Sequence, residues 1–149
     1  MTRRARCVLP LLLLAACARA TAPTPESDLR KLAKSLDVIA SSIGVVQDTV
    51  IAANTQHFID DAITGKVLQA TTKASKLGKD AVALVRTINA LTPEARAKLV
   101  NLITPLSQAI TAISLDTVSN SETKAKIQAL LASLATTVSS VQLILASGG

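Results

Sequence analysis

Few residues of this 149-residue chain have the types and spacing that catalysis requires. The single histidine, His57, is followed closely by Asp60 and Asp61, and nucleophilic catalysis of the Ser-His-Asp kind needs a histidine held between a serine and a carboxylate. These residues interrupt a helical pattern, however, and aspartate commonly caps a helix at such a position. We therefore predict an exposed histidine and a helix cap, with no catalytic residues.

A metal or cofactor site is not expected either. One histidine and two adjacent aspartates supply too few well-spaced ligands for zinc or calcium. Thr64-Gly65-Lys66 lacks the remainder of a phosphate-binding loop. We expect no metal and no cofactor, and we predict that the protein is not an enzyme.

The start of the chain has the layout of a secretory signal. Arg3, Arg4 and Arg6 precede an apolar run that ends in small residues and Cys17. The run of about 11 apolar residues is only half of the roughly 20 that cross a bilayer as a helix. We predict that residues 1–16 are a cleaved signal peptide. The alternatives are an ordinary signal that happens to contain a cysteine and an apolar N-terminus that is never exported.

The four residues Leu14-Ala15-Ala16-Cys17 closely resemble the lipobox of bacterial lipoproteins. The resemblance implies cleavage between Ala16 and Cys17, acylation of the Cys17 thiol and of the new amino terminus, and retention at a membrane. Lipid such as palmitate would be the only attached group. Ala18 is not the aspartate that the resemblance associates with inner-membrane retention. The resemblance therefore implies that the protein is located at the periplasmic face of the outer membrane, or at the outer face of the membrane in a cell with only one.

Composition excludes several kinds of partner. Loss of the signal peptide removes three arginines, so the formal net charge falls from +6 to about +3. With Phe58 as the only aromatic residue, the chain has no stacking platform for bases, and we expect no nucleic acid partner. Cys7 would be removed and Cys17 acylated, which leaves no cysteine pair for a disulfide.

Residues 17–25 are small or proline apart from Arg19 and form a predicted flexible tether of about 25 Å. Beyond them, apolar residues recur every three or four positions, which predicts helices over about 26–53, 60–90, 93–115 and 122–146. Asp60 or Asp61 would cap the second, Thr92 with Pro93 would begin the third, and Ser119 would cap the fourth. We predict an all-α domain over 26–149, an antiparallel four-helix bundle.

The predicted core consists of one apolar stripe on each helix, with the heptad spacing of coiled coils. The first stripe is Leu29, Leu32, Leu36, Ile39, Ile43, Val46, Val50 and Ala53. The second is Ile63, Val67, Ala70, Ala74, Leu77, Ala81, Leu84, Ile88 and Leu91. The third and fourth are Leu99, Leu102, Ile103, Leu106, Ile110 and Ile113, and Ile127, Leu131, Leu134, Val138, Val141 and Leu145. The first two predicted helices are longer than the other two. Part of their stripes is therefore expected to extend beyond the shorter pair and to be available to a partner.

Two uncharged segments leave a membrane alternative open. Residues 99–115 and 127–149 lack charged side chains and would permit a membrane hairpin of a pore-forming or lysis protein. Both contain serine, threonine, asparagine or glutamine opposite the apolar stripe, whereas lipid-facing helices are apolar all round. We therefore favour a bundle core.

The sequence predicts a membrane-anchored, non-enzymatic helical lipoprotein that acts as an interaction or structural module of the cell envelope. In architecture it resembles short helical lipoproteins of bacteria and phages. Lys66, Lys73 and Lys76 are candidate contacts for anionic lipid headgroups or acidic polymers. A protein partner or self-association through helix faces is also expected. The alternatives are a phage lysis component of the outer-spanin kind and a carrier of a small apolar ligand between the helices.

Overall fold

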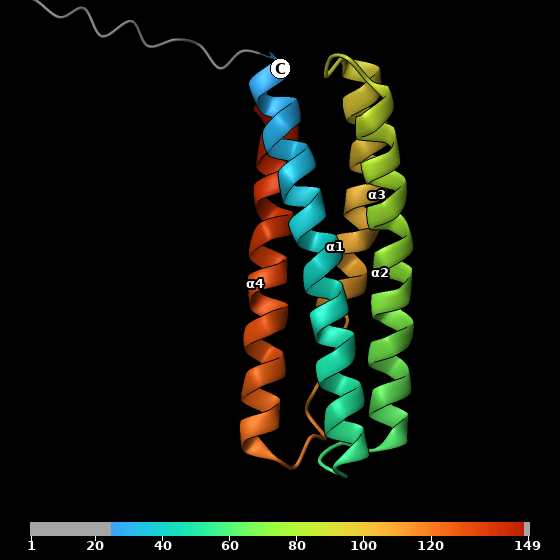
Figure 1. Cartoon of the computed structure of the whole chain (residues 1–149), viewed down its shortest axis with the longest axis vertical. Coiled ribbons are helices and arrows are strands. Elements are labelled where there is room, and N and C mark those ends of the chain that lie inside the picture. Colours follow the sequence, from blue (N-terminus) through green and yellow to red (C-terminus); the bar gives the residue numbers. More distant parts are fainter. Residues whose placement is uncertain (1–24, 148–149) are drawn as a thin grey trace, which may run out of the picture.

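The computed structural model, which describes residues 25–147, is an antiparallel four-helix bundle (Figure 1). The helices are α1 (Pro25–Thr55), α2 (Asp61–Thr87), α3 (Pro93–Thr111) and α4 (Ser121–Ala146). Each helix packs closely against the two that neighbour it in ring order, and the backbones of the diagonal pairs lie further apart. The predicted all-α bundle is therefore confirmed. The predicted signal peptide and most of the predicted tether lie outside the described residues.

The helix starts are capped by polar side chains. Asp60 Oδ1 accepts a hydrogen bond from the Ile63 amide at 2.7 Å, and Thr92 Oγ1 accepts one from Ala95 at 3.2 Å. A backbone hydrogen bond and one to the Thr92 side chain lower the pKa of the Glu94 carboxyl group in the first turn of α3. These starts agree with the prediction.

The predicted cap of α4 was wrong by one residue. The side chain of Asn120, and not that of Ser119, accepts a hydrogen bond from the Thr123 amide, at 2.8 Å. Asparagine caps helices about as well as serine does, and here the helix begins one residue later than a Ser119 cap requires. The local sequence offered three consecutive candidates, Ser119, Asn120 and Ser121.

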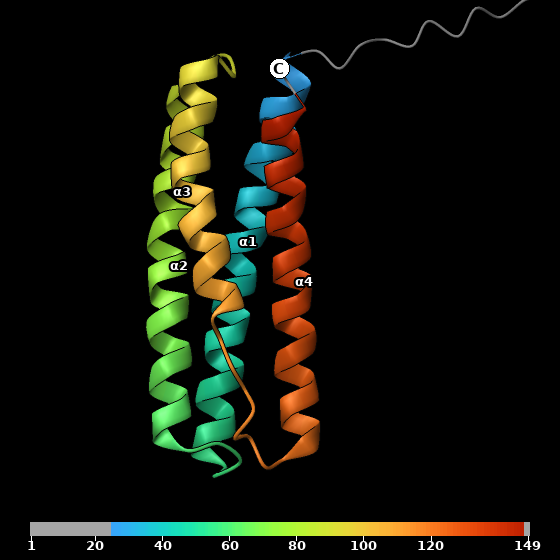
Figure 2. The same ribbon diagram turned by 180° about the vertical axis from the view of Figure 1, so that it is seen from behind.

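The third helix ends four residues earlier than predicted. The Ser114 hydroxyl donates to Asp116 Oδ2 at 2.7 Å and accepts from the Asp116 amide at 3.3 Å. Such local side-chain bonds compete with the helical backbone pattern. The chain from α3 to α4 then places Leu115 and Val118 in the core, beside Val50 and Ile63. Figure 2 shows this connection running along the bundle where α3 has ended.

The expected overhang of α1 and α2 was therefore wrong. The end of the bundle that α3 does not reach has a separate apolar cluster, closed by Leu115, Val118 and Ile127. The larger cluster, nearer the start of α1, draws residues from all four helices. The last part of the α1 stripe, Val46, Val50 and Ala53, is thus covered by the chain itself.

The buried stripe of α2 differs from the predicted one. Thr71 and Gly78 point into the core, whereas Ala70 and Leu77 are only half-buried. Gln47 Nε2 of α1 donates to Thr71 Oγ1 at 3.1 Å, and the Thr71 hydroxyl donates to the Val67 carbonyl oxygen at 2.8 Å. A threonine is tolerated in this core because its hydroxyl is fully paired.

Arg96 joins the two helices that have the least extensive interface, α3 and α4. Its Nη1 donates to the carbonyl oxygens of Ile144 and Leu145 at 3.1 and 2.9 Å, and its Nε donates to Leu91 at 3.2 Å. The last carbonyls of a helix lack partners within that helix, and a cation there also suits the helix dipole. One side chain thus fixes the end of α4 against the start of α3.

Gly78 gives a direct test of the α2 packing. A Cβ at this position would meet Leu106 Cδ1 at 3.6 Å, which is ordinary van der Waals contact. We expect Gly78→Ala to raise the free energy of unfolding by about 1 kcal/mol through helix propensity. Gly78→Leu should lower it by about 1–3 kcal/mol because the core has no room. Urea unfolding followed by circular dichroism measures both changes.

Gly65→Ala is the matched control, since nothing lies within 4 Å of a Cβ there. It should show the propensity gain alone. If Gly78→Ala proves destabilising while Gly65→Ala is stabilising, the described approach of α2 to α3 is incorrect.

Candidate functional sites

The predicted lipidation residue Cys17 and the predicted cleavage site between Ala16 and Cys17 lie outside the described residues. Eight residues, 17–24, separate Ala16 from the start of α1. With four antiparallel helices, α1 begins at the same end of the bundle at which α4 ends (Figures 1 and 2). We call this the α1-start end, and the opposite end, with the α1–α2 and α3–α4 connections, the loop end.

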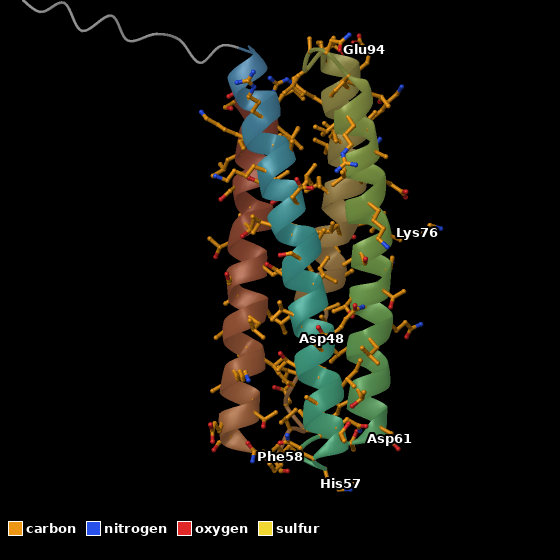
Figure 3. All side chains as sticks on the ribbon, viewed as in Figure 1. Asp48, His57, Phe58, Asp61, Lys76 and Glu94 are labelled. Carbon is orange, nitrogen blue, oxygen red and sulfur yellow. The ribbon has the colours of Figure 1, made fainter. Side chains whose placement is uncertain are left out.

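The three residues considered for catalysis, His57, Asp60 and Asp61, have different structural roles. His57 is exposed at the loop end (Figure 3) and has a positive φ of 58°. Asp60 caps α2, and Asp61 Oδ1 accepts a hydrogen bond from Asn54 Nδ2 at 2.9 Å. The Asn54 amide also donates to the Ile59 carbonyl oxygen at 3.3 Å, so it orders the α1–α2 connection. Sequence analysis missed Asn54, because the role depends on how the chain turns.

Across residues 25–147 no three histidine, cysteine or carboxylate side chains lie close enough to hold a metal ion. Two hollows, of about 240 and 370 Å³, adjoin Phe58 at the loop end. Both are open to solvent and lined largely by polar residues. Neither has the enclosed apolar shape typical of a small-molecule site.

The three candidate lysines, Lys66, Lys73 and Lys76, are all exposed on α2. Lys66 and Lys73 line an open groove between α2 and α3, together with Gln69 and Gln108. Lys76 points away from the bundle in Figure 3. The lysines therefore form a row along the side of the bundle, available to an anionic surface lying alongside it.

Two long stretches of the chain, one in and after α3 and one in α4, have no charged residue. The described chain has no charged residue from Leu99 to Leu115 or from Ile127 to Ser147. By length and composition, Asp28–Thr55 and Ser121–Ala146 pass as candidate membrane spans, and α3 does not. Both candidates contribute core residues to the bundle, as do the helices of many soluble proteins. Passing this test is therefore weak support for the membrane hairpin.

Comparison with known proteins identifies no relative. No family model matches the chain, and neither a curated protein nor a solved structure is significantly similar to it.

The positive φ of His57 gives a test of its structural role. A non-glycine residue pays a steric penalty in this region that glycine avoids. We expect His57→Gly to raise the free energy of unfolding by about 0.5–1 kcal/mol. Gln56→Gly, one residue earlier and without a positive φ, should lower it. A loss of stability in His57→Gly, measured by urea unfolding, would show that the imidazole makes a contact absent from this structure.

Proposed function

We propose that the protein is a lipid-anchored, non-enzymatic helical bundle of the bacterial envelope that works as an interaction or structural module. The observation that carries the proposal is the lipobox-like Leu14-Ala15-Ala16-Cys17 behind an arginine-led apolar run. Two or more acyl chains anchor a protein stably, whereas one gives only marginal binding. Cys17 is the residue to which we assign the attachment.

The bundle is well suited to being held in this way. The short segment after Cys17 leads into α1 at one end of the bundle, so the loop end would project furthest from the membrane. No buried side-chain polar atom among the described residues lacks a hydrogen-bond partner. The buried polar side chains of the described residues therefore need no ligand to complete their hydrogen bonds, which supports a structural role. Lys66, Lys73 and Lys76 remain our candidate contacts for an anionic surface.

The alternative roles find no specific support. A ligand carrier needs an enclosed cavity, but α2 approaches α3 closely at Gly78, and the hollows are open. An outer-spanin role would be tested by the neighbouring genes, which should encode a holin, an endolysin and an inner spanin.

Metabolic labelling with radioactive palmitate tests the anchor. We expect the wild-type protein to incorporate label and to fractionate with membranes, and Cys17→Ala to lose both properties because the acceptor thiol is gone. Cys7→Ala is the matched control and should label normally, since Cys7 belongs to the segment removed. An unlabelled wild-type protein, or label retained in Cys17→Ala, would contradict the proposal.

The residue after Cys17 tests the destination in a two-membrane cell. We expect the wild-type protein in the outer-membrane fraction of a sucrose gradient and Ala18→Asp in the inner-membrane fraction. Ala18→Ser serves as the control and should leave the distribution unchanged. If the wild-type protein is already found in the inner membrane, the outer-membrane assignment is wrong even where acylation is observed.

A further inference from the structure

The outer surface of α4 has a second three-four stripe, opposite its buried one. Its members are all exposed: Ala125, Ala129, Ala132, Thr136, Ser139 and Leu143. A helix that faces only solvent usually carries charged residues on its outer face. Here the outer face is uncharged from Ile127 onward. The adjacent stretch of α3 from Val100 to Thr104 is uncharged as well.

Two hydroxyl groups on or beside this face, those of Thr136 and Ser140, are bonded within the helix. Thr136 Oγ1 donates to the Ala132 carbonyl oxygen at 2.9 Å, and Ser140 Oγ donates to Thr136 at 3.0 Å. Covering a polar group is costly when its hydrogen bond to water is lost without replacement. The Thr136 hydroxyl on the face and the Ser140 hydroxyl beside it keep these bonds when the face is covered. The face can therefore be buried at small cost.

A protruding side chain and a hollow lie next to each other on this face. Leu143 is 70% exposed, the most exposed large hydrophobic side chain of the described chain. Beside it, a hollow of about 240 Å³ between α3 and α4 is lined by Val100, Ile103, Thr104, Gln142, Leu145 and Ala146. An aliphatic cavity of roughly 150 Å³ already holds a benzene-sized molecule, so the hollow has room for a leucine side chain.

We propose that this face binds the same face of a second copy of the chain, with Leu143 of each copy seated in the α3–α4 hollow of the other. A twofold axis makes such an interface self-complementary, since each copy supplies both the side chain and its hollow. Leu143 lies at the level of Gln142 and Ala146 in its own hollow. Leu143 and the hollow thus lie side by side at one level along the bundle. Leu143 of each copy can reach the hollow of the other only if the twofold axis runs parallel to the bundle.

That parallel orientation rests on the proposed lipid anchor. Two copies held in one membrane by the segments preceding α1 have their α1-start ends on the same side, which an axis along the bundle preserves. Charge also selects this face, because α2 presents lysines outward and the mature chain has a net charge of about +3. Two copies meeting through α2 would bring its exposed lysines together, whereas α4 has no charged residue from Ile127 to Ser147 and α3 has none from Val100 to Thr104.

Analytical ultracentrifugation of the full chain in detergent tests the interface. We expect the wild-type protein to be dimeric and Leu143→Lys to weaken the dimer at least about tenfold, because a charge would enter an apolar hollow. Val45→Lys is the matched control: Val45 is an exposed apolar residue of α1, outside the proposed interface, and its replacement should leave the dimer intact. A monomeric wild-type protein would overturn the proposal, as would equal effects of the two variants.

Ser139→Arg tests the same face at a second position. This variant should also dissociate the dimer, since Ser139 is exposed one turn before Leu143 on the same outer face. Circular dichroism checks that each variant stays helical. A dimer that withstands Ser139→Arg contradicts the proposed face.

Disulfide crosslinking in cells tests the orientation. Ser139→Cys should give a disulfide-linked dimer on a non-reducing gel, because equal positions meet in the parallel arrangement, and Val45→Cys should not. The chain without added cysteine distinguishes this proposal from the anchor proposal. A dimer band in that chain would show that Cys17 is an unacylated thiol, whereas a missing band in acylated Ser139→Cys would overturn the parallel dimer alone.

Discussion

The structure depends on burying four aliphatic stripes against one another. Few other interactions are available to hold the described residues together, since they contain no cysteine and one aromatic residue, Phe58, which is exposed. The ion pair between Lys31 and Asp28 spans 4.0 Å at the surface and contributes little to stability. Each fully buried leucine, isoleucine or valine contributes about 1.5–3 kcal/mol. The spacing of these residues therefore decides which face of each helix is buried, whereas local side-chain bonds set the helix ends.

This dependence explains what the sequence could predict. The stripes of α1 and α4 consist of large aliphatic residues with few competitors, and the predicted residues are nearly all buried. In α2 the inner positions include Thr71 and Gly78, which hydrophobicity does not distinguish from solvent-facing positions. Their burial follows from the close approach of α1 and α3. The early end of α3 depends likewise on a local Ser114–Asp116 bond and on space that Leu115 fills.

The candidate sites show a similar division. The helix-boundary roles of His57 and Asp60 could be predicted, because capping is a local property of the chain. The roles of Asn54 and Arg96 could not, since their acceptors are set by a turn and by the end of a distant helix. The outer stripe of α4 was not predicted, because the sequence indicated only polar residues opposite the apolar stripe. It acquires meaning only once the inner face is known to be occupied and Leu143 is found beside a hollow.

The arrangement of the chain ends has a mechanical consequence. A load between the start of α1 and the loop end runs parallel to all four helix axes, so the interfaces resist it in shear and many side chains must slip together. A load between the start of α1 and the end of α4 acts at one end of the bundle and peels these helices apart a few contacts at a time. Arg96, which clamps the end of α4 to α3, lies where that peeling would begin. The same fold thus resists force along its length and yields more easily when α1 and α4 are pulled apart at the α1-start end.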